Sequence, residues 1–439
     1  MAFNLYILYL ISFLLHFTSR VPALGAMRFD MVLSLIVLVL MISSQKKRAT
    51  TAPGGGAGLP REQIDAGVGK MLYIIYAYII VTLPLVQYPG SVLHTNLLNF
   101  FKSTLFFFFT ANLVDTRRRL QILIVVLLGC QIFRVLEPLY LNLFFGYWGS
   151  QTWIGNGEFA QRLSGGPYDV INSNGLAFVI LMVLPFLHYL TIDDPKLKWI
   201  YLGALPLMLL ALVKSLSRTG MIGFVIAYAG VFMRSKRKGL VLVLVAIATP
   251  LVFVNLSDIQ KDRYLSIFSS NTRQGATASG RFEGMQVDFQ IALQRPVFGF
   301  GLGTSAEAKY HLIGNGQLAH DLYLEVAQEL GFVGLALFLV FLKRIVDNFR
   351  LVKRKLAALG RPDPYITRLV DALQVWMLVS LFFSIASYGL SEWTWYFFAG
   401  ISLAVVRVVN AEQQATSREQ GAPGTPPPPQ KPARAALAP

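Results

Sequence analysis

Four residues have the types and neighbours expected of reactive groups. Arg218 stands in Ser-Leu-Ser-Arg-Thr-Gly, Arg281 in Ala-Ser-Gly-Arg-Phe-Glu-Gly, and His320 in Gln-Leu-Ala-His-Asp-Leu-Tyr. The fourth, Arg162, precedes Leu-Ser-Gly-Gly-Pro-Tyr. A guanidinium group suits a phosphate or pyrophosphate because its fork of N–H donors matches oxyanion geometry. A neutral imidazole can take a proton from an attacking hydroxyl, so this set predicts chemistry on a phosphate-bearing substrate.

Two of the arginines lie next to predicted membrane spans. Ser217 is expected to add a hydroxyl donor beside Arg218; alternatively, Arg218 only snorkels to the membrane interface. The Gly-Gly-Pro turn is expected to bring Arg162 over the membrane surface, with Asn172 or Asn174 capping the next helix. The alternative for Arg162 is an ordinary surface arginine.

Arg281 is predicted to lie at the N-terminus of a helix. Ser279 or Gly280 would cap this helix, leaving free backbone N–H groups and the positive end of the helix dipole beside the arginine. Such a combination favours an anion. The alternative is an ion pair of Arg281 with Glu283 or Glu307.

His320 is expected at a boundary between water and membrane, on the same side as the arginines. Neighbouring positive charges would hold its pKa down, and only His311 rivals it as a base. Glu325 and Glu329 are four residues apart, so both can face one side of a helix. Glu325 is predicted to contact substrate or to pair with an arginine, and Glu329 to mark the interior of the bundle.

The elements that must position these residues are membrane spans. Of the 439 residues 54% are hydrophobic and 14% are charged, which predicts an all-α polytopic membrane protein. The apolar run from Phe3 is expected to be a first span rather than a signal peptide. At about 20 residues a span, about twelve are predicted. They lie at residues 3–17, 27–44, 71–88, 96–114, 120–141, 173–191, 198–215, 218–233, 239–256, 322–342, 370–388 and 392–409.

Charge sets the expected orientation. The 39 Lys and Arg outnumber the 23 Asp and Glu, but most lie in short loops between spans, so they do not indicate a nucleic acid partner. The positive-inside rule then predicts both termini in the cytoplasm and the reactive residues on the outer side of the membrane. We expect a transmembrane domain over 1–410, a periplasmic loop at 257–320 within it, and a disordered cytoplasmic tail at 411–439.

The long loop and the linker differ in composition. Residues 49–69 are rich in Gly and are expected to be a flexible linker. The 257–320 loop, between spans nine and ten, instead contains an amphipathic pattern from Gly280 to Ala292 with Phe282 and Phe289 at helical spacing. We therefore expect this loop to contain helices and to carry function.

Several reaction types lack their motifs. No Gly-rich loop precedes a Lys-Ser/Thr pair, no Gly-x-Ser-x-Gly elbow occurs, and no His, Cys or Asp cluster has metal-ligand spacing. The single cysteine, Cys130, excludes a disulfide framework. We expect a reaction without metal or other cofactor.

The order of the motifs resembles one family. Ser-Arg-Thr-Gly, then Ser-Gly-Arg and Pro-Val-Phe-Gly-Phe-Gly-Leu-Gly, then His-Asp-Leu-Tyr-Leu-Glu with Glu-Leu-Gly, is similar to the O-antigen ligase and polymerase superfamily of bacterial envelope glycosyltransferases. The similarity covers about residues 70–400 and is most specific between 160 and 335. The family's usual His-Asn is His-Asp here. The resemblance implies a membrane glycosyltransferase of the GT-C type with a periplasmic active site.

The resemblance also implies a reaction and its partners. Arg218 and Arg281 would bind the pyrophosphate of an undecaprenyl-linked O-antigen, with Arg162 as a third contact, and His320 would activate a sugar hydroxyl of the acceptor. Departing pyrophosphate develops negative charge, which arginines stabilise without metal. One base without a carboxylate nucleophile indicates inversion. We expect an O-antigen ligase that acts on lipid A-core in the inner membrane, among membrane lipids.

Two alternatives stay open. A polymerase or another oligosaccharyltransferase of the same superfamily would use similar arginines on the same donor. A flippase for lipid-linked oligosaccharides would also span the membrane many times, but it should carry an internal repeat and charges at mid-membrane. Charges inside predicted spans include Lys102, Arg134 and Glu137; the last two are expected to pair with each other.

Overall fold

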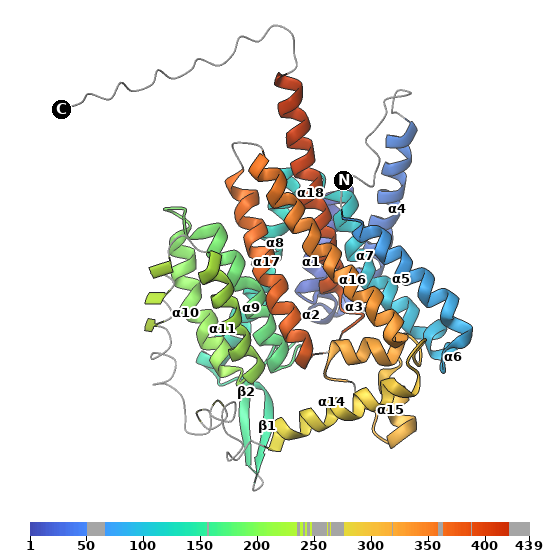
Figure 1. The fold of residues 1–439 in the computed structure, drawn as a ribbon. Coiled ribbons are helices and arrows are strands. Elements are labelled where there is room, and N and C mark those ends of the chain that lie inside the picture. Colours follow the sequence, from blue (N-terminus) through green and yellow to red (C-terminus); the bar gives the residue numbers. More distant parts are fainter. Residues whose placement is uncertain are drawn as a thin grey trace, which may run out of the picture.

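The computed structural model is mostly helical (Figure 1). It describes residues 1–50, 66–155, 158–234, 276–317, 319–358, 363–387 and 389–420, with a few further residues between 238 and 264. Most of the predicted span at 239–256 and most of the linker at 49–69 lie outside these residues. The longer helices are α1 (Ala2–Leu14), α4 (Phe29–Thr50), α5 (Val68–Thr82), α7 (Leu97–Leu113), α8 (Arg117–Phe145), α9 (Ser173–Thr191), α10 (Lys198–Lys214), α11 (Arg218–Arg234), α14 (Ala276–Gln294), α15 (Ser305–Ile313), α16 (Leu322–Ala358), α17 (Pro364–Phe383) and α18 (Trp393–Gln420).

Short elements join these helices. They are the α-helical turns α2 (Phe17–Arg20), α3 (Pro22–Ala26) and α6 (Pro89–Ser91), the 3-10 turns η2 (Leu83–Leu85) and η4 (Ser384–Ala386), and the π turn η3 (Val92–Asn96). The strands β1 (Gly149–Gly155) and β2 (Glu158–Leu163) pair antiparallel. This hairpin departs from the all-α expectation, and it lies where the sequence indicated only an external loop.

Five described helical segments are long and apolar enough to cross a membrane. They are Val68–Leu85, Arg117–Phe145, Ser173–Thr191, Pro364–Ala386 and Trp393–Gln414. Ala2–Leu14, Phe29–Gln45 and Arg218–Met233 are shorter apolar helices. Every predicted span other than 239–256 coincides with a helix. The total of twelve spans stays a prediction.

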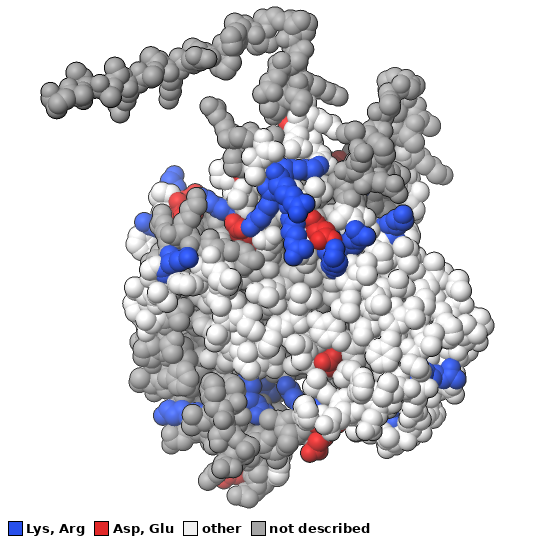
Figure 2. Space-filling view, in the orientation of Figure 1, with Lys and Arg blue, Asp and Glu red and all other residues white. Residues whose placement is uncertain are grey.

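The bundle has two chemically different ends. One end carries β1, β2, α14 and α15, and the C-terminal ends of α4 and α18 extend from the other (Figure 1). Figure 2 shows Lys and Arg gathered near the second end, beside a broad band of surface with few charges. A band of this kind suits the hydrocarbon region of a bilayer. Loops predicted to be cytoplasmic supply ion-paired residues of this end, including Arg117, Lys343, Arg350, Lys353 and Arg368.

The core is centred on α18, whose apolar window is 83% buried, against 33% for the window that begins in α5. Helix α18 packs on α7 and α16, and α17 packs on α9 and α11. The ring of Trp376 on α17 stacks on that of Phe398 on α18, with 3.5 Å between centroids. Helices that are apolar on every face are typically buried, and α18 fits this rule. Helix α18 continues to Gln420, so residues 411–420 of the predicted disordered tail are helical. Residues 421–439 are not among the described residues.

A break in α16 fastens the predicted long loop to the bundle. Gly331 interrupts the helix with a φ of 69°, and a Cβ there would lie 2.2 Å from the carbonyl oxygen of Val297. The glycine-rich segment 296–303 lies along this break. Its Phe300 N–H donates to the carbonyl of Gln328 at 2.8 Å, and Phe332 N–H donates to that of Pro296 at 2.7 Å. Backbone can approach this closely because the glycines lack side chains.

Two ion pairs replace the expected pair of Arg134 with Glu137. Arg134 binds Asp169 through Nε and Nη2, at 2.6 and 2.9 Å, and Glu137 instead accepts from Arg20 at 2.6 Å. The prediction that Arg134 and Glu137 pair was therefore wrong. A spacing of three residues on a helix permits an ion pair between Arg134 and Glu137. Each instead forms hydrogen bonds with a partner that is distant in sequence.

Candidate active site

The turn between α10 and α11 presents Arg218. Leu216 adopts a left-handed conformation, with a φ of 49°, which lets two helices follow each other almost without a loop. Ser217 caps α11, since its hydroxyl accepts from the N–H of Gly220 at 3.0 Å. Arg218 is therefore the first residue of α11, at the positive end of its dipole.

Ser217, which was predicted to add a hydroxyl donor beside Arg218 as a substrate contact, makes hydrogen bonds within the protein. It is fully buried, and its hydroxyl donates to Asn174 Oδ1 at 2.9 Å while it accepts from Gly220. Both of these bonds are internal to the protein. In the structure Ser217 positions Arg218.

Arg162 is fixed against the same turn. It lies on β2, where its Nε donates to the carbonyl of Ser215 and its Nη2 to Asn174 Oδ1, both at 3.0 Å. Asn174 therefore binds both Arg162 and Ser217. The expected cap of α9 is Asn172, whose side chain accepts from the N–H of Gly175 at 2.9 Å.

Arg281 reaches the site from α14. This helix begins at Ala276, so Arg281 lies beyond its first turn, and neither Ser279 nor Gly280 is a cap. The predicted helix N-terminus at Arg281 was wrong, although the predicted helix over 280–292 is confirmed. Arg281 forms no ion pair with Glu283 or Glu307, all three being among the described residues.

Electrostatic interactions connect the three arginines. Burial together with the positive charges of Arg281 and Arg218 lowers the pKa of Arg162 to about 10. At neutral pH all three guanidinium groups still carry their charge. Like charges repel, so their accumulation at one end of a bundle indicates a site for an anion.

His320 lies beside this cluster, just before α16. Burial and the positive charges of Arg281 and Lys309 lower its pKa below the usual 6.5, and Asp288 opposes this shift. The imidazole is therefore neutral at pH 7. Its Nε2 lies 2.8 Å from the side-chain amide nitrogen of Gln317, which donates to it.

The residue after His320 has a structural role. Asp321 caps α16, accepting from the N–H of Leu324 at 2.9 Å. Asp and Asn are about equally good caps, which explains why His-Asp can stand where His-Asn is usual.

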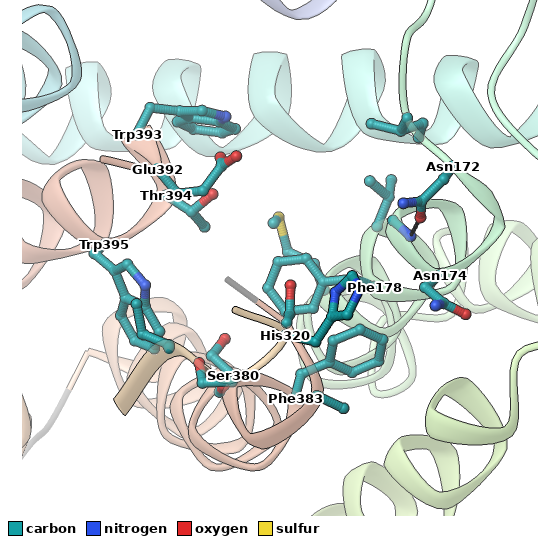
Figure 3. A pocket seen from close by; sticks show the side chains of 18 of the residues that line it. Asn172, Asn174, Phe178, His320, Ser380, Phe383, Glu392, Trp393, Thr394 and Trp395 are labelled. Atoms are coloured by element: carbon teal, nitrogen blue, oxygen red, sulfur yellow. Dashed lines mark hydrogen bonds between the residues drawn. The ribbon is translucent and has the colours of Figure 1, made fainter. Parts of the chain in front are cut away.

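Arg281 and His320 line a cavity of about 430 Å³. Its wall comes from the N-terminal ends of α9 and α18, the C-terminal end of α17, and the segment before α16 (Figure 3). Phe178 and Phe383 lie on the same side as His320, and Glu392 lies across the open space. The volume is within the range of small-ligand sites, about 300–1,000 Å³.

Glu325 does not line this cavity. It is buried in α16, and its Oε2 accepts from the backbone N–H of Gly389 at 2.6 Å. No ion pair joins it to any described arginine, so pairing with one of the three is not observed. Glu329 is buried as predicted.

Sequence reasoning missed two residues of the site. Asn174 was considered only as a cap, yet it holds Arg162 and Ser217. Glu392 was not singled out; its position between Ser391 and Trp393, at the start of an apolar run, was the available clue. Among the described residues no group of His, Cys, Asp and Glu has the geometry to hold a metal ion.

The arrangement can bind an anion and remove a proton next to it. Three positive charges lie close enough to interact, which favours an anion between them, and a neutral imidazole beside Arg281 can accept a proton. The cavity gives space for a second reactant that carries that proton.

Comparison with known families agrees with this geometry. The family model described as O-Antigen ligase matches residues 203–339, which include Arg218, Arg281 and His320. A comparison with curated proteins found no match. The motif order and the helical membrane architecture agree with this match: residues 203–339 match the O-antigen ligase family, which supports membership of the chain in the O-antigen ligase/polymerase superfamily.

Proposed function

We propose that the protein is an O-antigen ligase of lipopolysaccharide biosynthesis. It transfers glycan from undecaprenyl pyrophosphate to a sugar hydroxyl of lipid A-core. The single observation that carries the proposal is the meeting of Arg162, Arg218, Arg281 and His320, which come from four separate segments, beside one cavity.

The arginines bind the pyrophosphate of the donor. Arg218 and Arg281 contact its oxygens directly, while Arg162 is a third contact through the donors that Ser215 and Asn174 leave unused. As the sugar leaves, negative charge grows on the pyrophosphate, and guanidinium groups already in place stabilise it. This accounts for a leaving group without a metal ion.

His320 is the base. The acceptor hydroxyl takes the place of the Gln317 amide and gives its proton to the imidazole as its oxygen attacks the anomeric carbon. The new bond forms as the bond from that carbon to the pyrophosphate oxygen breaks. A single displacement of this kind inverts the anomeric configuration.

The proposal includes an orientation. The site faces the periplasm from the inner membrane, the basic end of the bundle faces the cytoplasm, and both termini are cytoplasmic. Residues 1–410 form the transferase domain, with 257–320 as a periplasmic loop within it. The distribution of Lys and Arg in Figure 2 supports this orientation.

Reconstituted transfer tests the proposal. Purified protein in nanodiscs receives undecaprenyl-pyrophosphate glycan and lipid A-core without ATP or added metal, and products are separated on a gel. A ladder on lipid A-core is expected, unchanged by a chelator. His320→Ala should abolish it, whereas His311→Ala, a matched control at an exposed position of α15, should retain it.

Each other outcome of this assay would indicate a different function. Lengthening of the donor without transfer would identify a polymerase. Absence of both products would contradict transfer and favour the flippase, and transfer by His320→Ala would exclude His320 as the base.

A further inference from the structure

The cavity wall opposite His320 is built from the first residues of α18 and the residue before it. Figure 3 shows the Glu392 side chain directed into the open space, with Trp393 beside it. The proposed transfer mechanism assigns no role to either. Both nevertheless line the cavity in which His320 would act.

The Glu392 carboxylate has no hydrogen-bond or ion-pair partner among the described residues. The nearest cation that affects it is Arg134, but Arg134 is already bound by both oxygens of Asp169. Glu392 is an exposed residue that faces the cavity, so its carboxylate is accessible to a ligand bound there (Figure 3).

Of the three tryptophans on the wall, Trp393 is the least enclosed. Trp376 is fully buried against Phe398, and Trp395 is 6% exposed. Trp393 is half-buried and packs on Phe13, so its ring is supported from behind while part of it remains accessible. An indole in this setting offers an apolar surface to a ligand.

Two further polar groups on the wall lack partners. The hydroxyl of Ser380 and the indole N–H of Trp376 are buried and have no hydrogen-bond partner in the part of the chain that the structure describes. Both residues line the cavity. Buried polar groups are normally paired, so their presence here indicates a ligand with hydroxyl groups.

We propose that Glu392 and Trp393 form the binding subsite for a sugar ring of the acceptor. The Glu392 carboxylate accepts hydrogen bonds from two neighbouring hydroxyls, and the indole of Trp393 packs against the C–H face of the ring. A further hydroxyl of the same sugar then faces His320. The proposal rests on the proposed function for the identity of the acceptor, but its binding site is argued from the cavity itself.

A binding measurement tests the subsite without requiring transfer. The probe is core oligosaccharide released from lipopolysaccharide by mild acid, titrated into purified protein by calorimetry. Glu392→Ala and Trp393→Ala should each raise Kd about tenfold or more, and Glu392→Gln should have a smaller effect because it keeps one acceptor oxygen. Matched controls are Glu307→Gln on α15 and Trp199→Phe on α10, both outside the cavity lining, which should bind normally.

The transfer assay adds a readout that a structural role would not change. The Glu392 and Trp393 variants should raise KM for lipid A-core and leave KM for the donor unchanged. Unfolding of a variant would not produce this split, since it would lower the amount of active protein without changing either KM.

The outcomes separate the two proposals. Oligosaccharide binding that depends on Glu392, in a protein that transfers nothing, would support the subsite and refute the ligase. Normal transfer, with unchanged acceptor Kd and KM in both alanine variants, would overturn the subsite and leave the ligase intact. A wild-type protein that neither binds the oligosaccharide nor transfers glycan would overturn both.

Discussion

The buried pair of Arg134 and Asp169 should be among the most sensitive points of the fold. Arg134 is 8% and Asp169 1% exposed at the side chain, and two hydrogen bonds of 2.6 and 2.9 Å join them. Arg134 also donates to Gln131 at 3.0 Å, and Asp169 accepts from the N–H of Ile171 at 3.2 Å. The pair thus ties α8 to the loop that leads into α9.

We predict that Arg134→Met destabilises the protein by about 3–5 kcal/mol, because it leaves the Asp169 carboxylate buried without its cation. At about 2 °C per kcal/mol, the value for large domains, the melting temperature should fall by roughly 6–10 °C. The double variant Arg134→Met with Asp169→Leu should recover much of this loss, since it removes the uncompensated charge.

The measurement is thermal melting of the purified variants in one detergent at one scan rate, arranged as a double-mutant cycle. Lys343→Met is a control, because the pair of Lys343 with Asp347 is exposed at the other end of the bundle and should contribute less than about 1 kcal/mol. Melting of Arg134→Met within a degree of wild type would refute the reasoning. So would a double variant no more stable than the single one.

Three further predictions concern the site and its support. Arg218→Lys should lower kcat/KM roughly 10- to 100-fold, because a point charge does not replace the guanidinium fork; near-normal turnover would mean that Arg218 only snorkels. With His320 as the base, kcat/KM should rise with pH through a pKa below 6.5. Arg281→Gln should move this rise to higher pH, because it removes a positive charge that lowers the pKa of His320. An unchanged pH profile in the residual activity would contradict the interaction of Arg281 with His320. Gly331→Ala should destabilise the protein by more than about 2 kcal/mol, because of backbone strain and overlap of the new Cβ with Val297. Gly129→Ala in α8 is the control, since nothing lies within 4 Å of a Cβ there. Equal melting temperatures of the two variants would refute the role of the break in α16.

Local sequence information predicted most of the helices. Span positions follow from runs of apolar residues, and those runs are continuous in the sequence. The cap of α9 by Asn172 also follows from a local rule. The reactive arginines and His320 could be placed on one side of the membrane, since sidedness depends only on the number of spans between them.

Partner choice could not be predicted in the same way. Asp169 is 35 residues from Arg134, and Glu137 is 117 residues from Arg20. Nothing local distinguishes these pairs from the three-residue spacing of Arg134 and Glu137. The hydrogen bonds of Ser217 could not be predicted either, because a serine before a helix can cap it or contact a ligand, and the sequence does not show that its hydroxyl binds Gly220 and Asn174.

The contact partner of the glycine-rich segment 296–303 also could not be predicted from the sequence. Its pattern was noticed, but the sequence does not reveal that its partner is the broken helix around Gly331. That contact holds the end of α14 against α16, and Gln328 strengthens it by donating to the carbonyl of Asp288 at 2.9 Å. These contacts therefore fix α14, which carries Arg281, relative to α16, which His320 precedes.

The three arginines differ in how firmly the protein holds them, and this difference suggests a division of roles. Arg162 uses two of its donors on Ser215 and Asn174, so it is fixed before any substrate arrives. Arg281 is exposed and forms no ion pair with a described residue, so its guanidinium can adjust to the substrate. A fixed charge stabilises a leaving group without reorganisation, while an adjustable one can follow the pyrophosphate as its bond to the sugar lengthens. In the proposed mechanism, Arg162 on β2 would therefore supply a fixed charge, and the exposed Arg281 on α14 an adjustable one.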